Sequence, residues 1–225
     1  MKILIRFYLF AIGLLLPDYL LSQKLVNLDW QYTTGNLSPL IQWNSSTIAP
    51  NGDLISVANT FHPGQDINVL ITRFDEEGTQ LWQREYNHSG SSIDYGADVI
   101  VDASGYIYIC GATKASQTTT SDYLILRYTA NGDLDWSDTY DGSASADDYA
   151  GSLTLDEFGD LYITGASQGT GTGYDFVTLK YETGGAIIWD RRYDRNGYDD
   201  IAVKILYNPD LGIDITGGSG QSAIN

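Results

Sequence analysis

Residues 94–113 read DYGADVIVDASGYIYICGAT, and residues 148–167 read DYAGSLTLDEFGDLYITGAS. Eight of the twenty aligned positions are identical, where unrelated segments would share about one. Both segments consist of two runs rich in Val, Ile, Leu and Tyr, joined by a short turn that contains glycine. Such runs are typical of β-strands. The two segments therefore predict a repeated β-hairpin.

Tryptophan marks the same repeat along the rest of the chain. Four tryptophans recur at intervals of 52, 54 and 53 residues, and a tyrosine follows each of the last three by four positions. Self-similarity at a fixed period of this length indicates units that pack on one another. The residues that we expect to be structural in this repeat are Trp30, Trp82, Trp136, Trp189, Tyr86, Tyr140, Tyr193, Gly111, Gly165 and Gly217.

Each full unit contains four strand-like runs. Asn131-Gly132 separates the last two runs of the second unit and is a strong hairpin signal, because both residues tolerate positive φ. Several runs are apolar on both faces, which indicates sheets that are covered on both sides. Four short antiparallel strands in a unit of about 53 residues is the pattern of a propeller blade.

We therefore predict an all-β fold, a β-propeller with four-stranded antiparallel blades. The predicted mature domain spans residues 23–225. It contains an outer strand at 28–34, three complete blades at 44–86, 97–140 and 150–193, and an incomplete blade at 201–217.

One unit resembles the bacterial β-propeller repeat, the SBBP repeat. The resemblance is carried by Asp148-x-Ala150, by the run from Asp156 to Gly165, and by Asp175-Phe176-Val177-x-Leu179-Lys180-Tyr181, and it covers residues 28–219. It implies a secreted propeller, usually of seven blades, with the first run of each blade innermost and the tryptophan run outermost. No common activity belongs to the family, and a tryptophan such as Trp136 departs from its commonest form. With the outer strands of the last blade missing, we expect the chain to be a fragment.

The N-terminus predicts an export signal at residues 1–22. Lys2 and Arg6 precede an apolar run that is too short to span a bilayer, and cleavage would leave Gln23 first. The alternative is an uncleaved membrane anchor. We expect a secreted or cell-surface protein that does not insert into the membrane after cleavage. The net charge of −17 makes nucleic acid an improbable partner. Cys110, the only cysteine, cannot form an internal disulfide.

Aspartate carboxylates are the main candidate functional groups in the sequence. His62 and His88 do not recur between units, and no nucleophile motif accompanies them. The weak calcium candidates sit where each unit begins, and radial repetition would place them in a ring. Three interpretations stay open: hydrogen bonding that fixes the turns, cation binding, and acid–base work on a glycan. The candidates are Asp94, Asp147, Asp148, Asp199 and Asp200.

The repeat, the export signal and the scarcity of catalytic groups predict a non-catalytic module that binds or scaffolds protein or glycan partners at the cell surface. We predict no enzyme activity and no cofactor, with calcium as the one possible ion. The alternative is a secreted enzyme on a propeller, either glycan-processing or similar to quinone-dependent dehydrogenases. The run from Tyr128 to Trp136 faintly resembles the dehydrogenase repeats but lacks their usual Ala-x-Asp-x-x-x-Gly.

Overall fold

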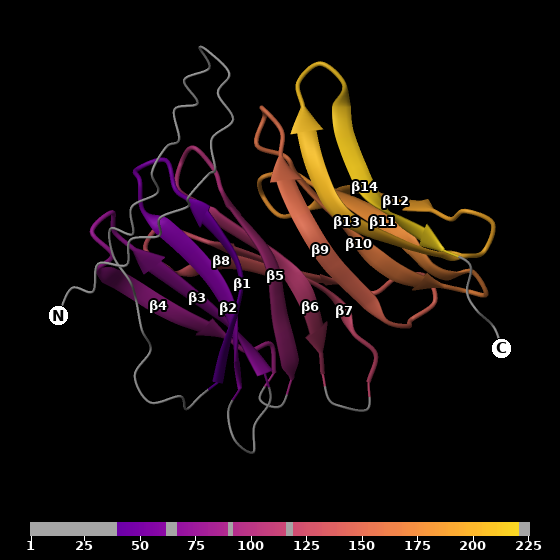
Figure 1. The fold of residues 1–225 in the computed structure, drawn as a ribbon, viewed down its shortest axis with the longest axis horizontal. Helices are drawn as coiled ribbons and strands as arrows, with labels where there is room; N and C mark the ends of the chain where they lie inside the picture. Colours follow the sequence, from indigo (N-terminus) through magenta and orange to yellow (C-terminus); the bar gives the residue numbers. More distant parts are fainter. Residues whose placement is uncertain (1–39, 62–66, 90–91, 116–118, 221–225) are drawn as a thin grey trace, which may run out of the picture.

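The computed structural model describes residues 40–61, 67–89, 92–115 and 119–220 (Figure 1). The predicted signal at 1–22, the strand at 28–34, Trp30 and His62 lie outside the described residues. The described chain forms fourteen β-strands and contains no helix, and all of its strand pairs are antiparallel. The predicted all-β class and the four-stranded antiparallel units are confirmed. Over the same residues, no helix is long and apolar enough to cross a membrane.

Three four-stranded sheets and one two-stranded sheet follow one another along the chain, and within each the spatial order equals the chain order. Sheet A contains β1 (Leu40–Ile48), β2 (Leu54–Phe61), β3 (Ile67–Phe74) and β4 (Gln80–Tyr86). Sheet B contains β5 (Ile93–Val101), β6 (Ile107–Lys114), β7 (Asp122–Tyr128) and β8 (Leu134–Tyr140). Sheet C contains β9 (Asp148–Leu155), β10 (Leu161–Gly169), β11 (Gly173–Tyr181) and β12 (Ile187–Tyr193). Sheet D contains β13 (Asp199–Asn208) and β14 (Gly212–Gly220).

Sheet B is covered by apolar side chains on both faces, and successive residues of β6 and β7 alternate between two cores. This two-sided burial explains why the runs lack the polar–apolar alternation of a half-exposed strand. The core toward sheet A includes Ile55, Val57, Val69, Ile71, Ile107, Ile109, Leu124 and Leu126. The core toward sheet C includes Tyr108, Cys110, Tyr123, Ile125, Leu153, Ile163, Val177 and Leu179.

Consecutive sheets stack face to face with their first strands together (Figure 1). Strand β5 contacts β1, β2 and β3, strand β9 contacts β5, β6 and β7, and strand β13 contacts β9, β10 and β11. Strands β4, β8 and β12 form the opposite edges of their sheets. The sheets therefore fan out from the line of first strands, and the described strands do not close a ring.

The first strand of each sheet begins a few residues before the predicted unit. Strand β5 starts at Ile93, β9 at Asp148 and β13 at Asp199, where polar residues suggested a turn. Asp94, Asp148 and Asp200 are fully buried within these strands. Local hydrogen bonds satisfy part of each carboxylate, which allows a charged residue inside a strand where composition alone favours a loop.

The three repeated glycines face a bulge in the neighbouring first strand. The pairing register shifts between Gly96 and Asp98 in β5, and the matching shifts occur in β9 and β13. A Cβ on Gly111 would lie 1.8 Å from the carbonyl oxygen of Tyr95, and a Cβ on Gly165 would lie 2.0 Å from that of Tyr149. These positions require glycine because the backbone itself occupies the space.

The outer part of sheet A is fixed to the outer turn of sheet B. The indole N–H of Trp82 and the guanidinium of Arg73 both donate to the carbonyl oxygen of Ala130, at 3.1 and 2.5 Å. One sheet further, the Arg127 guanidinium donates to the carbonyl of Thr183, the residue equivalent to Ala130. Repeated contacts of this kind hold the distal ends of adjacent sheets together.

Trp136 and Trp189 contact aromatic residues. The Trp136 ring stacks on Tyr181 of sheet C, with centroids 6.0 Å apart. Trp189 meets Tyr162 of its own sheet edge-on at 5.9 Å. Trp82 and Trp136 thus lie between adjacent sheets, where their large apolar area is partly covered.

We expect Gly165→Ala to lower the free energy of unfolding by about 2–4 kcal/mol, because the added methyl collides with backbone rather than with a flexible side chain. The matched control is Gly151→Ala in strand β9, where the nearest atom to a new Cβ is 3.7 Å away. Urea unfolding of both variants measures the difference. Equal stability of the two variants would contradict the close approach described above.

Candidate cation sites at the junctions between sheets

The buried aspartate of each first strand holds the loop that arrives from the preceding sheet. Asp94 Oδ2 accepts the backbone N–H of His88 at 2.9 Å. Asp148 Oδ2 accepts that of Gly142 at 2.6 Å. In sheet D, the equivalent bond runs from the Arg195 N–H to Asp200 Oδ2, also at 2.6 Å. At least one oxygen of each carboxylate therefore accepts a hydrogen bond that fixes a loop, as the first of the three interpretations expects.

The second oxygen of these aspartates meets different surroundings in each sheet. The Thr113 hydroxyl donates to Asp94 Oδ1 at 2.6 Å. At the same register in sheet C, Ser167 faces Asp148, but Asp148 Oδ1 is buried and has no hydrogen-bond partner. In sheet D, Asp200 Oδ1 is buried and has no hydrogen-bond partner. The repeated carboxylate is thus fully satisfied in sheet B, whereas one of its oxygens has no partner in sheet C and in sheet D.

Asp147 and Asp199 connect neighbouring sheets through a second kind of bond. Asp147 Oδ1 accepts the backbone N–H of Ser121 in sheet B at 2.9 Å. Asp199 Oδ1 accepts that of Tyr174 in sheet C at 3.0 Å. Asp147 directly precedes the first strand of sheet C, and Asp199 is the first residue of the first strand of sheet D. Each accepts a backbone N–H near the start of the third strand of the preceding sheet. The structure therefore distributes the five predicted candidates over three junctions rather than gathering them at one site.

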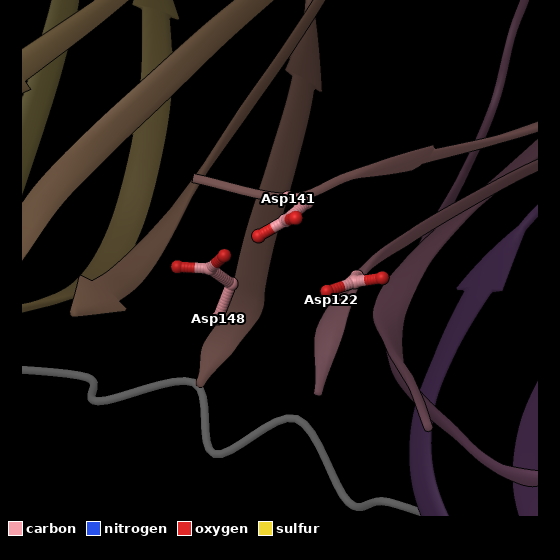
Figure 2. Close-up of side chains that lie close together, drawn as sticks. All are labelled: Asp122, Asp141 and Asp148. Carbon is pink, nitrogen blue, oxygen red and sulfur yellow. The ribbon is translucent and has the colours of Figure 1, made fainter. Parts of the chain in front are cut away.

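Two groups of three close carboxylates lie at the junctions. The B–C triad consists of Asp122, Asp141 and Asp148, and Figure 2 shows their carboxylates gathered from three separate segments. The C–D triad occupies the equivalent positions and consists of Asp175, Asp194 and Asp200. In each triad, one carboxylate oxygen per residue lies within 4.8 Å of the others.

Four triad members were not among the predicted candidates: Asp122, Asp141, Asp175 and Asp194. Their signal is present in the sequence, because Asp122 and Asp175, like Asp141 and Asp194, are 53 residues apart. They sit at the start of a third strand and after a fourth strand, so only the strand order and the docking of the next sheet bring them to the first-strand aspartate.

The A–B junction has the same geometry but a different charge. The positions equivalent to Asp122 and Asp141 are Asn68 and Asn87, so Asp94 is the single carboxylate among the three equivalent positions. The Ser92 hydroxyl bonds both Asn87 Oδ1 and Asp94 Oδ2, at 2.9 and 2.7 Å. Neutral groups thus satisfy Asp94, while Asn68 donates from Nδ2 to Glu85 Oε1 at 3.0 Å and keeps a buried Oδ1 without a partner.

Burial and mutual repulsion shift the titration of the B–C triad. Burial raises the pKa of Asp122, and the nearby Asp141 and Asp148 carboxylates raise it further. Burial also raises the pKa of Asp148, partly opposed by the Ser167 hydroxyl and the Gly142 N–H. Both effects disfavour the ionised carboxylate, so the triad favours the uptake of a positive charge, whether proton or cation.

A separate carboxylate, Asp98, joins the first strands of all four sheets. Asp98 Oδ1 accepts the Ser45 hydroxyl at 2.8 Å, while Oδ2 accepts the Ser152 hydroxyl at 3.1 Å and the Lys204 ammonium at 2.9 Å. These four residues occupy equivalent positions of successive repeats, 53, 54 and 52 residues apart. Lys204 of sheet D therefore reaches past sheet C to sheet B. Sequence reasoning missed Asp98 because no motif surrounds it.

His88 and Cys110 have structural surroundings. The His88 Nδ1 atom lies 3.2 Å from the Tyr86 hydroxyl, and its backbone holds Asp94 as described above. Cys110 is fully buried between sheets B and C, and burial raises the pKa of its thiol, so it stays protonated. Neither arrangement activates a nucleophile.

A cleft of about 700 Å³ lies between strands β11 and β12 of sheet C and strand β14 of sheet D. Its lining includes Phe176 and Tyr193. Tyr123, which is equivalent to Phe176, is fully buried against sheet C, whereas Tyr193 is 56% exposed. At the other junctions, the third and fourth strands of the next sheet cover this part of the preceding sheet. Sheet D has two strands over the described residues, so we interpret the cleft as an uncovered face of sheet C rather than a ligand pocket.

A scan against protein-family models and a search of curated proteins found no match to this chain. The likeness to the bacterial β-propeller repeat, and the export and origin that it implies, stay predictions.

We expect the Asp98 contacts to appear in the pH dependence of stability. The Lys204 ammonium and the Ser45 hydroxyl outweigh burial and lower the pKa of Asp98 below its ordinary 3.8. A lowered pKa in the folded protein gives stability that is complete above pH 3.8 and is lost as pH falls through the folded value. Asp98→Asn should cost about 1–2 kcal/mol at pH 7, since Lys204 is half exposed and screened.

Urea unfolding between pH 7 and pH 2 measures this effect. The decline of stability below pH 4 should be shallower in Asp98→Asn than in the wild type. The control is Asp135→Asn, whose carboxylate is 37% exposed and pairs with Arg127 at the outer edge. An unchanged acid limb in Asp98→Asn would show that Asp98 is not held as described.

Proposed function

We propose that the chain is an exported β-propeller module that serves as a non-catalytic scaffold, presenting loops that bind a protein or glycan partner at the cell surface. The proposal rests on the contrast between a repeated scaffold of sheets and loops that are not repeated. The sheets and their buried aspartates repeat, whereas the loops that they fix differ in length and sequence.

The propeller arrangement is supported by the packing of the sheets. Face-to-face stacking places β1, β5, β9 and β13 in sequence, and Asp98 and Lys204 link two first strands that are not neighbours. Such a contact is expected where strands surround a common axis. Four-stranded units fanned in this way are the building plan of a propeller.

The loops between consecutive sheets are the best candidates for a binding surface. Loop 141–147 reads DGSASAD and loop 194–198 reads DRNGY. Ser145 and Asn196 in these loops adopt positive φ, of 46° and 62°. Asparagine adopts positive φ readily in turns, whereas for Ser145 this conformation is uncommon and must be fixed by its surroundings. Rigid strands carrying dissimilar loops suit recognition.

Export is tested first. When the full chain is produced in a bacterium with a C-terminal tag, we expect the tag in the periplasm or medium and Gln23 as the first residue by mass spectrometry. The matched control replaces Leu14 and Leu15 by Arg, which should leave an uncleaved precursor in the cytoplasm. An unprocessed Met1 form of the natural sequence in the cytoplasm would contradict export.

Binding without turnover is the second test. On an array of bacterial and host glycans and immobilised envelope proteins, we expect saturable binding that is lost when residues 143–146 are replaced by Gly-Gly-Ser-Gly. Replacing Leu211, an exposed turn residue of sheet D, by Ser should leave binding intact. Hydrolysis of an array glycan, or quinone absorbance in protein loaded with pyrroloquinoline quinone and calcium, would instead favour the enzyme alternative.

A further inference from the structure

The C–D triad joins three separate segments of the chain. Asp175 lies in β11 of sheet C, Asp194 follows β12, and Asp200 lies in β13 of sheet D. Asp175 and Asp200 are both fully buried, and Asp194 is exposed. One side of the triad is therefore enclosed by the two sheets, while the other side is open to solvent.

One oxygen of each carboxylate already has a partner. Asp175 Oδ2 accepts the Arg192 guanidinium at 2.7 Å and the Thr172 hydroxyl at 2.9 Å. Asp200 Oδ2 accepts the Arg195 N–H, and Asp194 Oδ1 accepts the Gly197 N–H, both at 2.6 Å. These bonds fix the three carboxylates in place.

The other oxygens of the two buried carboxylates have no partner. Asp175 Oδ1 and Asp200 Oδ1 are both shielded from solvent and accept no hydrogen bond. Buried, unpaired carboxylate oxygens are strongly unfavourable, and close like charges add repulsion. A positive species between the two sheets that binds both carboxylates would remove this cost.

The charge and the donor atoms define that species. Three carboxylates and the Arg192 guanidinium sum to −2, which a divalent cation neutralises. All donors of the triad are carboxylate oxygens, which suit a hard cation better than zinc, whose structural sites use Cys and His. The exposed Asp194 leaves one side open to water ligands. Calcium accepts several oxygens in flexible geometry, whereas magnesium demands a near-ideal octahedron.

We propose that the C–D triad binds one calcium ion, with Asp175 Oδ1, Asp200 Oδ1 and the Asp194 carboxylate as protein ligands. The ion joins sheet D to sheet C. The A–B junction carries Asn68 and Asn87 and has no such site. At the B–C junction only one triad oxygen, Asp148 Oδ1, is buried without a partner, and Asp122 is only half-buried, so the need for a cation is smaller.

Calcium titration by isothermal calorimetry tests the proposal, with the full chain in chelator-treated buffer. We expect saturable binding that weakens at least tenfold in Asp194→Asn. Because Asp194 is exposed, this variant should fold normally, and Asp200→Asn should abolish the site. The matched control is Asp141→Asn at the equivalent loop position of the B–C triad, which should leave the C–D affinity unchanged. No calcium binding by the wild type, or equal affinity in Asp194→Asn, overturns the proposal.

Thermal unfolding separates calcium from the alternatives. At saturating calcium we expect the wild-type Tm to rise by about 5 °C and the Asp194→Asn Tm to change little. Magnesium at the same concentration should give a smaller rise. If a shared proton fills the triad instead, Tm in chelator would rise from pH 7 to pH 5 and calcium would add nothing, and that result would also overturn the proposal.

Discussion

The burial of both faces of each central sheet is the constraint on which the rest of the structure depends. Strands β6 and β7 direct successive side chains into two different cores, so sheet B cannot be stable with solvent on either side. Removing apolar area from water contributes roughly 25 cal/mol per Å². A single four-stranded unit therefore gains its stability from neighbours on both faces, and stacking follows from the composition of the strands.

Face-to-face stacking buries charged and polar groups at the first strands, and two arrangements of hydrogen bonds stabilise them. Along the line of first strands, Asp98 collects hydroxyl and ammonium donors from three other sheets. At the strand starts, buried aspartates accept backbone N–H groups from the incoming loops. Where three carboxylates meet, as around Asp175 and Asp200, hydrogen bonds alone do not satisfy every oxygen. The junctions therefore share the same backbone arrangement but differ in the number of carboxylates that they bring together.

Much of the fold could be predicted from the sequence, and less of the candidate sites. The period and the apolar runs predict four strands per unit, because strand composition and turn residues are local signals. The grouping of Asp175 with Asp194 and Asp200 depends on strand order and on how the next sheet docks, which local patterns do not contain. Asp98 escaped notice for the same reason: its partner Lys204 lies 106 residues away. The strand starts were misplaced because buried aspartates resemble turn residues in composition.

The central claim is that the first strands of successive sheets lie together around one line. Zero-length carbodiimide cross-linking of the native protein, followed by tandem mass spectrometry, tests it most directly, because the Lys204 ammonium lies 2.9 Å from an Asp98 oxygen. The account predicts an amide between the peptides that contain Asp98 and Lys204. Links from Lys204 to carboxylates at the outer edges of the sheets, such as Glu77 or Asp135, with Asp98 unmodified, would contradict it.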